Sequence, residues 1–182
     1  ARAQRRLLRE RAVKGHIHQL PFEQNGLTFA FGFALSTIPR LVDHLLARVG
    51  VRTRRNPNAL RIVLQDRSER DGITDLEIQE ADGSVLALLE AKVSGWPGLP
   101  QLSKYARRKG VVPRRTVVVA LGVPPAPSTL AQKSFLSGRG RRVRLRVLRW
   151  VDILSIAHGL RRSTGGLRGQ IVEQLHSLIE EV

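Results

Sequence analysis

Two acidic side chains and a lysine lie on either side of a predicted turn, where a β-hairpin would bring them together. Asp82-Gly83 is a strong hairpin signal, because a two-residue type I′ loop needs positive φ at both central residues. With these residues as the loop, Asp75 lies directly opposite Glu90, and their Cβ atoms are expected roughly 4.5–5.5 Å apart. Lys92 then shares the sheet face of Glu90, since side chains on a strand alternate between faces.

Opposed carboxylates destabilise a sheet unless something cationic lies between them. A hard divalent ion bound through carboxylate oxygens is the natural candidate. The apolar run Val85–Leu89 before Glu90 is typical of a strand buried on both faces, which favours a shielded site. The alternative is a surface salt-bridge cluster worth little in stability, on a polar face that Glu77 and Gln79 continue.

Three further segments have the pattern of strands around this hairpin. Leu60–Gln65 precedes the hairpin and would complete a three-stranded antiparallel meander. Thr116–Val123 is an apolar run that a helix separates from the strand of Glu90, a pattern that indicates a parallel crossover. Arg141–Trp150 alternates between apolar residues and arginines, as in a half-buried strand. The predicted fold class is therefore α/β, with a central mixed β-sheet flanked by helices.

Helical periodicity occurs near both ends of the chain. A stripe of apolar residues at three- and four-residue steps predicts an amphipathic helix, with a break near Pro39, and consists of Leu27, Phe31, Ala34, Ile38, Leu41, Leu45 and Val49. Glu23 precedes this stripe on the same face, either as a favourable charge at a helix N-terminus or as a further acid of the site. Leu167–Val182 predicts an amphipathic helix that covers the sheet or forms a homodimer contact.

The chain is strongly basic, with a formal net charge of +16 and a sequence pI of about 11.7. Such a balance is typical of nucleic-acid-binding proteins. Residues 1–20 are expected to form a basic arm or helix, and residues 21–182 a single domain. No signal peptide and no apolar run of membrane-spanning length is visible, so we expect a cytoplasmic protein without a membrane partner. Cysteine is absent, which excludes disulfides and thiol nucleophiles.

The arginines of the alternating segment give it one charged side. Arg142, Arg144 and Arg146 point away from the apolar side of the predicted strand. They are expected either to follow the phosphates of a nucleic acid or to form a solvated edge that discourages aggregation. Lys104 and Arg108 add positive charge to the helix after the hairpin and complete the predicted nucleic-acid contacts.

The ordered acids and lysine resemble the PD-(D/E)XK superfamily of restriction-endonuclease-like nucleases. Asp75 matches the first acid of that family, and Glu90, Ala91 and Lys92 match its second motif. Thr74 stands in place of the proline that names the first motif, as in many members. The resemblance implies a restriction-endonuclease-like core.

A third element of the resemblance lies downstream of the hairpin. Gln101 and Tyr105 match the QxxxY motif of the RecB-like branch, and Glu23 matches a glutamate that many members carry upstream. The resemblance covers roughly residues 21–150. The resemblance implies that Gln101 and Tyr105 help to hold the substrate strand. The sequence pattern by itself is equally compatible with Tyr105 packing against Leu102 and Leu99.

The resemblance implies a metal-dependent phosphodiesterase acting on nucleic acid, with DNA the expected substrate and endonucleolytic cleavage the expected mode. Mg²⁺, or Mn²⁺, would be held by Asp75, Glu90, Glu23 and the Ala91 carbonyl. Lys92 would orient the attacking water. The alternative is a non-catalytic nucleic-acid-binding module that keeps the nuclease fold.

Overall fold

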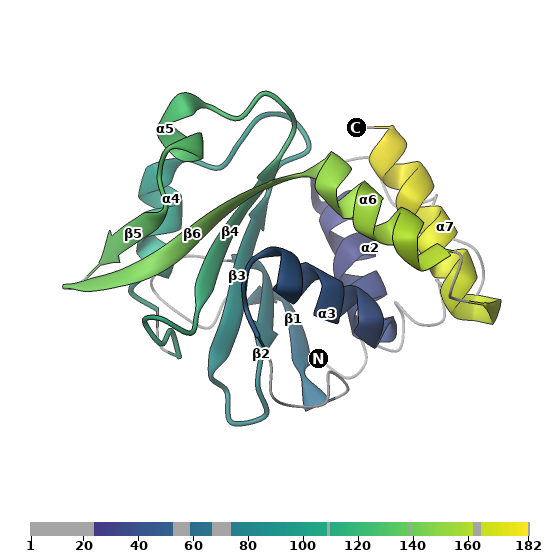
Figure 1. Ribbon diagram of the computed structural model, residues 1–182, viewed down its shortest axis with the longest axis horizontal. Helices are drawn as coiled ribbons and strands as arrows, with labels where there is room; N and C mark the ends of the chain where they lie inside the picture. The colour runs from purple at the N-terminus through teal and green to yellow at the C-terminus, as the bar shows by residue number, and fades with distance from the viewer. Residues whose placement is uncertain are drawn as a thin grey trace.

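The computed structural model describes residues 24–52, 59–66, 74–108, 110–138, 140–161 and 165–181. These residues form a six-stranded mixed β-sheet with helices on both faces (Figure 1). The predicted α/β class, with a central mixed sheet flanked by helices, is confirmed. The basic segment 1–20 and Glu23 lie outside the described residues.

The sheet begins with the predicted three-stranded meander, after which two strands pair in parallel orientation. The strands are β1 (Arg61–Asp66), β2 (Thr74–Gln79), β3 (Val85–Ala91), β4 (Val117–Gly122), β5 (Phe135–Gly138) and β6 (Arg141–Arg149), in the sheet order β1-β2-β3-β4-β6-β5. β1, β2 and β3 are antiparallel to one another, whereas β4 is parallel to β3 and β6 is parallel to β4. β5 pairs with β6 in antiparallel orientation and forms one edge of the sheet.

Six helices are present among the described residues: α2 (Gln24–Thr37), α3 (Pro39–Arg48), α4 (Leu99–Tyr105), α5 (Ser128–Ala131), α6 (Trp150–Arg161) and α7 (Gly166–Glu180). The predicted break near Pro39 is confirmed, because α2 ends at Thr37 and this proline begins α3. All seven apolar stripe residues of this segment are buried. Five apolar residues of α7 are buried in the same core as those of α2 and α6, namely Ile171, Val172, Leu175, Leu178 and Ile179, whereas Leu167 is exposed. The helix packs against α2 and α6.

The two faces of the sheet carry different layers. α2, α3, α6 and α7 gather on one side, which we call the four-helix face, and α4 and α5 lie on the other, the α4 face (Figure 1). Leu89 and Val119 belong to the core of the four-helix face, whereas Leu88 and Val118 belong to the smaller core of the α4 face. This alternation assigns each polar strand residue to one side of the sheet.

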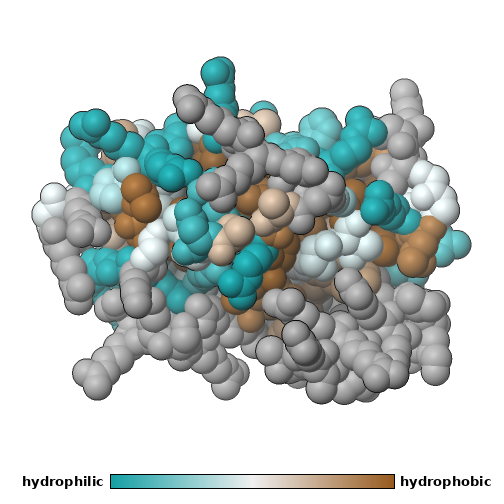
Figure 2. Space-filling model, turned by 90° about the horizontal axis from the view of Figure 1, so that it is seen from below, coloured by the Kyte–Doolittle hydropathy of each residue, from teal (hydrophilic) through white to brown (hydrophobic). Residues whose placement is uncertain are grey.

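The surface of the described residues carries only scattered apolar groups. Its exposed large hydrophobic residues are Val112, Phe135, Val151 and Leu167. Seen from below, hydrophilic residues are spread over the described part of the surface with apolar patches between them (Figure 2). No described helix combines the length and the apolar character needed to cross a membrane.

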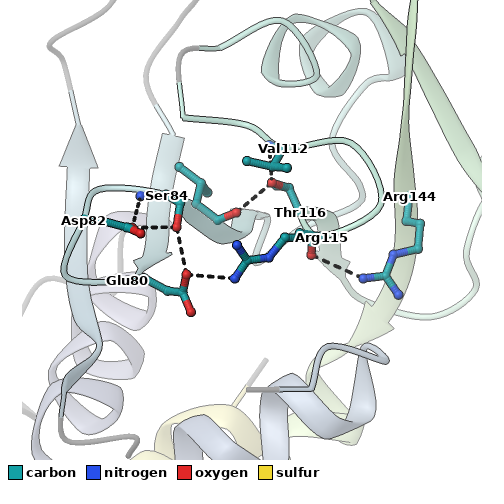
Figure 3. Close-up of polar contacts among 8 residues, drawn as sticks. Glu80, Asp82, Ser84, Val112, Arg115, Thr116 and Arg144 are labelled. Carbon is teal, nitrogen blue, oxygen red and sulfur yellow. Dashed lines mark hydrogen bonds and ion pairs between the residues drawn. The ribbon is translucent and has the colours of Figure 1, made fainter. Parts of the chain in front are cut away.

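The β2–β3 hairpin differs from the predicted two-residue turn. Its loop is the three-residue segment 81–83, since the N–H of Glu80 donates to the Ser84 carbonyl at 2.9 Å. Gly83 has a positive φ of 83°, but Asp82 does not, because its carboxylate instead accepts hydrogen bonds from the N–H and hydroxyl of Ser84 (Figure 3). The predicted type I′ loop is therefore wrong, and the geometry is that of a turn closed by one left-handed glycine.

A β-bulge then restores the predicted strand register. Gln79 pairs with Val85, but Ile78 pairs with Ala87, so Leu86 is an extra residue on β3. The longer loop and the bulge offset each other. Beyond the bulge Leu76 pairs with Leu89. The same register places Asp75 opposite Glu90, as the sequence predicts.

Candidate acidic site

Asp75 and Glu90 lie side by side on the α4 face, where β2 and β3 run past the start of α4. The Oδ2 atom of Asp75 accepts a hydrogen bond from the backbone N–H of Ala91 at 2.9 Å. This bond ties the carboxylate of β2 to the strand that carries Glu90. The site is therefore held by two paired strands rather than by a loop, which favours precise placement of both acids.

Helix α4 orients Glu90 through two of its side chains. Gln101 Nε2 donates to Oε1 of Glu90 at 2.6 Å, and the Tyr105 hydroxyl donates to Oε2 at 2.5 Å. Gln101 Nε2 also lies 3.2 Å from the Tyr105 hydroxyl oxygen. Pro100 in the first turn suits the start of a helix, and the four-residue spacing places Gln101 and Tyr105 on the same side. The QxxxY residues thus contact the second acid directly, and Tyr105 is buried between that acid and the core of the α4 face.

Lys92 completes the cluster at the end of β3. Its Nζ lies 3.4 Å from Oε1 of Glu90, and its side chain is 27% exposed, against 3% for Glu90. Ala91 between them is buried in the core of the four-helix face, so the predicted alternation of these residues is confirmed. Lys92 and Asp75 are thus partly exposed, whereas Glu90 is buried.

Contacts from β4 and from the start of α6 hold the backbone of Lys92. Its N–H donates to the Leu121 carbonyl, and its own carbonyl accepts a 2.9 Å hydrogen bond from Trp150 Nε1. Trp150 packs edge-on against Phe31 of α2, with ring centroids 5.9 Å apart. The position of the lysine therefore depends on the core of the four-helix face.

Burial makes ionisation of both carboxylates costly, and the charge of Asp75 adds to the cost for Glu90. Burial raises the pKa of Asp75, although the Ala91 N–H and the positive charge of Lys92 oppose this shift. Burial and the charge of Asp75 raise the pKa of Glu90, against hydrogen bonds from Tyr105 and Lys92. Burial and the contact with Glu90 also raise the pKa of Tyr105, so its hydroxyl stays a donor at neutral pH. One lysine does not balance two buried acids.

This donor set suits a hard divalent cation. Magnesium is commonly held by one or two carboxylates and keeps several waters, so two adjacent acids are enough. Within the described residues, Oδ1 of Asp75 accepts no hydrogen bond, which leaves it available as a ligand. No cluster of three or more His, Cys, Asp or Glu side chains suited to a metal occurs in the described ranges, and the third predicted acid, Glu23, lies outside them.

A second ion pair, which the sequence did not indicate, lies next to the acidic site. Arg108 Nη2 lies 2.9 Å from Oε1 of Glu77, and both side chains are only 2% exposed. The Thr74 hydroxyl donates to Glu77 and accepts from Arg108, and Gln79 donates to the other Glu77 oxygen. Thr74, at the position of the missing proline, thus bridges the pair.

This pair corrects two expectations. Arg108 was predicted to contact nucleic acid, but it lies beyond the end of α4 with its guanidinium buried against Glu77. The polar face continued by Glu77 is likewise buried rather than solvated. The reason is that the turn after α4 covers this part of β2, which helical spacing alone does not indicate. Lys104, by contrast, is exposed.

The three arginines of β6 do not share the face of the acidic site. Arg144 pairs with Val117 and Arg146 with Val119, both of which belong to the core of the four-helix face. Glu90, in contrast, points to the α4 face with Leu88. Arg144 is paired with β4 on one side and β5 on the other, so the alternative of a solvated sheet edge is wrong for this arginine. Arg142 pairs with β5, and Arg146 pairs with β4.

Comparison with known proteins identified no relative: no protein-family model, no curated protein and no solved structure matches this chain.

Proposed function

We propose that this chain is a divalent-metal-dependent nuclease with a restriction-endonuclease-like core, which hydrolyses phosphodiester bonds in DNA as an endonuclease. The observation that carries the proposal is the adjacent pair of a partly buried Asp75 and a buried Glu90, accompanied by one lysine. Burial raises the pKa of both acids, and the charge of Asp75 raises the pKa of Glu90 further, so the pair is costly unless a cation joins it. The net charge of +16 supports a polyanionic substrate.

Each residue of the cluster has a distinct role in this proposal. Asp75 and Glu90 hold the cation, with the Ala91 carbonyl as a further oxygen donor expected from the family resemblance. When bound, the cation supplies an activated water and charge stabilisation at the phosphate. Lys92 presents its ammonium group toward solvent beside Glu90, where it stabilises negative charge on the phosphate oxygens and orients the attacking water.

Gln101 and Tyr105 are positioning residues for Glu90. Their donated hydrogen bonds hold both carboxylate oxygens in one orientation. Oε1 is also contacted by Lys92, whereas Oε2 accepts from Tyr105 and keeps a second lone pair that can bind a cation. The raised pKa of Tyr105 keeps its proton in place for this contact.

The test is cleavage of supercoiled plasmid and of linear single- and double-stranded DNA with Mg²⁺ or Mn²⁺, compared with EDTA. Asp75→Asn and Lys92→Met are expected to lower the rate by about a hundredfold or more, the usual cost of removing one group that stabilises transition-state charge. Lys133→Met is the matched control, because this exposed lysine lies apart from the acidic site.

The outcomes separate the two functional classes. Metal-dependent cleavage that both site variants lose and the control keeps would support the nuclease. Full activity in Asp75→Asn or Lys92→Met would overturn the site. Binding that is equal with EDTA and without any cleavage would favour the non-catalytic binding module instead.

A further inference from the structure

The arginine row, defined as Arg142, Arg144 and Arg146, carries positive charge that no described carboxylate balances. Among the ion pairs of the described residues, Arg115 next to the row pairs with Glu80 at 2.8 Å, but no member of the row pairs with an acid. The row sits on one face of an interior strand at two-residue steps, roughly 6.6 Å apart. Like charges so placed are unfavourable without an anionic partner.

Arg144 is held in a fixed orientation without losing its charge. Its Nη1 donates to the Gly50 carbonyl at 2.8 Å, and its Nη2 donates to the Arg115 carbonyl at 3.3 Å (Figure 3). Its Nε is buried and has no hydrogen-bond partner among the described residues. Backbone carbonyls orient a guanidinium but leave its positive charge in place, so Arg144 adds a fixed cation to the row.

An aromatic side chain lies on the same face beside the row. Phe135 of the edge strand β5 pairs with Arg144, so both residues point to the four-helix face. Phe135 is 41% exposed, and the guanidinium carbon of Arg142 lies 4.4 Å from its ring centroid. β5 and the adjoining half of β6 extend away from the layer formed by α2, α3, α6 and α7 (Figure 1). The helices therefore do not cover this corner.

We propose that this surface binds single-stranded nucleic acid, with the arginine row on successive phosphates and Phe135 stacked on a base. Arginines that follow a backbone, next to an exposed aromatic ring, are the combination by which proteins hold single strands. A duplex keeps its bases stacked inside and offers none to Phe135. The identity of the polyanion rests on the proposed nuclease function.

This surface is separate from the acidic site. The arginine row lies on the four-helix face, where Arg144 is level with Ala87 of β3 and Arg146 with Leu89. Glu90 and Lys92 lie at the end of β3 on the opposite face, the α4 face. The row therefore holds substrate at a distance from the reacting phosphate. Its loss is expected to raise KM and to leave kcat unchanged.

The experiment measures binding by fluorescence anisotropy in EDTA, so that no cleavage occurs. The probes are a labelled single-stranded oligonucleotide, the matching duplex, and heparin as a polyanion without bases. The variants are Phe135→Ala and the double variant Arg142→Ala/Arg146→Ala, which leaves Arg144 and its structural contacts intact. Arg61→Ala is the control, an exposed arginine on the opposite edge strand. Circular dichroism checks that each variant folds.

Phe135→Ala is expected to weaken single-strand binding by about five- to a hundredfold, the range for one stacked base, and to leave heparin binding unchanged. The double arginine variant should weaken binding of all three probes and lower the slope of log affinity against log salt by about 1.4, for two phosphates of a single strand. Arg61→Ala should bind like the wild type.

Two results would overturn the proposal: single-strand binding that Phe135→Ala leaves intact, or wild-type affinity in the double arginine variant. Failure of this inference is distinguishable from failure of the nuclease. Row variants that bind normally in an enzyme that cleaves would overturn the surface alone. Weakened single-strand binding in a protein that never cleaves would support the surface and overturn the nuclease.

Discussion

Two charged clusters on the same face of β2 differ in charge balance. Glu77 and Arg108 form one pair, with 2% of each side chain exposed and a separation of 2.9 Å. Asp75 lies two residues before Glu77 on β2, beside Glu90 of β3. The cation near these two acids is Lys92, whose side chain is 27% exposed. The first cluster is neutral and closed, and the second carries an excess negative charge beside a solvent-accessible lysine.

The comparison separates a structural pair from a candidate site. A buried pair with further hydrogen bonds has its charges satisfied within the chain and needs no ligand. Thr74 and Gln79 supply those bonds to Glu77. At the acidic site, burial instead raises the pKa values of Asp75 and Glu90, and the charge of Asp75 raises that of Glu90 further, a state that a bound cation would relieve. Charge balance, rather than the presence of charged residues, distinguishes the two clusters.

The largest expected effect comes from breaking the balanced pair. Arg108→Met leaves Glu77 buried without its cation and is expected to lower the free energy of unfolding by about 3–5 kcal/mol, as measured by urea denaturation. The double variant Glu77→Gln/Arg108→Met should recover much of this loss, because it removes both charges. A loss below about 1 kcal/mol in the single variant would show that the pair is not closed as described.

The acidic site should behave in the opposite way when one acid is removed. Because the folded-state pKa values of Asp75 and Glu90 are raised, their contribution to stability is present at low pH and is lost as the pH rises through these raised values. In EDTA at pH 7, Asp75→Asn should therefore be at least as stable as the wild type. The difference in unfolding free energy between the two proteins should vanish below pH 3.8, the ordinary pKa of an aspartate.

Added Mg²⁺ should then make the wild type more stable than Asp75→Asn. Mg²⁺ at a hundred times its Kd stabilises the wild type by about 2.7 kcal/mol and should leave Asp75→Asn unchanged in thermal melts. Asp43→Asn is the matched control, since this acid lies on α3 away from the site. Equal stabilisation of the wild type and Asp75→Asn would remove Asp75 from the ligand set.

The smallest expected effect is at a surface cluster in which one acid contacts two arginines. Asp152 in the first turn of α6 accepts hydrogen bonds from the Arg149 backbone and side chain and from Arg48. Burial alone would raise its pKa, but these bonds outweigh it and lower the pKa below 3.8. Asp152→Ala should cost about 1 kcal/mol at pH 7, as for a lost helix cap.

The pH dependence of this variant has the opposite sign to that of the acidic site. A lowered pKa gives stability that is present above 3.8 and is lost as the pH falls through the folded-state value. The gap in unfolding free energy between the wild type and Asp152→Ala should narrow below pH 3.8. A gap that stays constant with pH would assign the effect to packing rather than to the charge.

Much of the fold and the contacts of the acidic site could be predicted from periodicity and register. Apolar runs and steps of two, three or four residues identified five of the six strands and α2, α3, α4 and α7, because these elements bury one face or both. The helices α5 and α6 and the strand β5 were not predicted. α6 begins directly after β6, at Trp150, without a turn residue between them, and β5 is only four residues long.

The predicted alignment of Asp75 with Glu90 rested on a loop that the protein does not have. The hairpin loop is one residue longer than predicted, and the bulge at Leu86 compensates. Asp-Gly is compatible with more than one turn type, and here the contacts of the Asp82 carboxylate with Ser84 accompany the longer loop. The bulge depends on how both faces of β3 pack, which the local sequence does not specify. The burial of Arg108 was missed for a related reason, because tertiary contacts with β2 override the expectation that an arginine is solvated.

Trp150 links the position of Lys92 to the helices on the opposite face of the sheet. It begins α6, its indole N–H holds the Lys92 carbonyl, and its ring rests on Phe31 of α2. The side chain of Lys92 serves the α4 face, while its backbone is anchored from the opposite layer. Any rearrangement that displaces the start of α6 would therefore displace Lys92, which gives a partner bound to the helices a direct mechanical route to the acidic site.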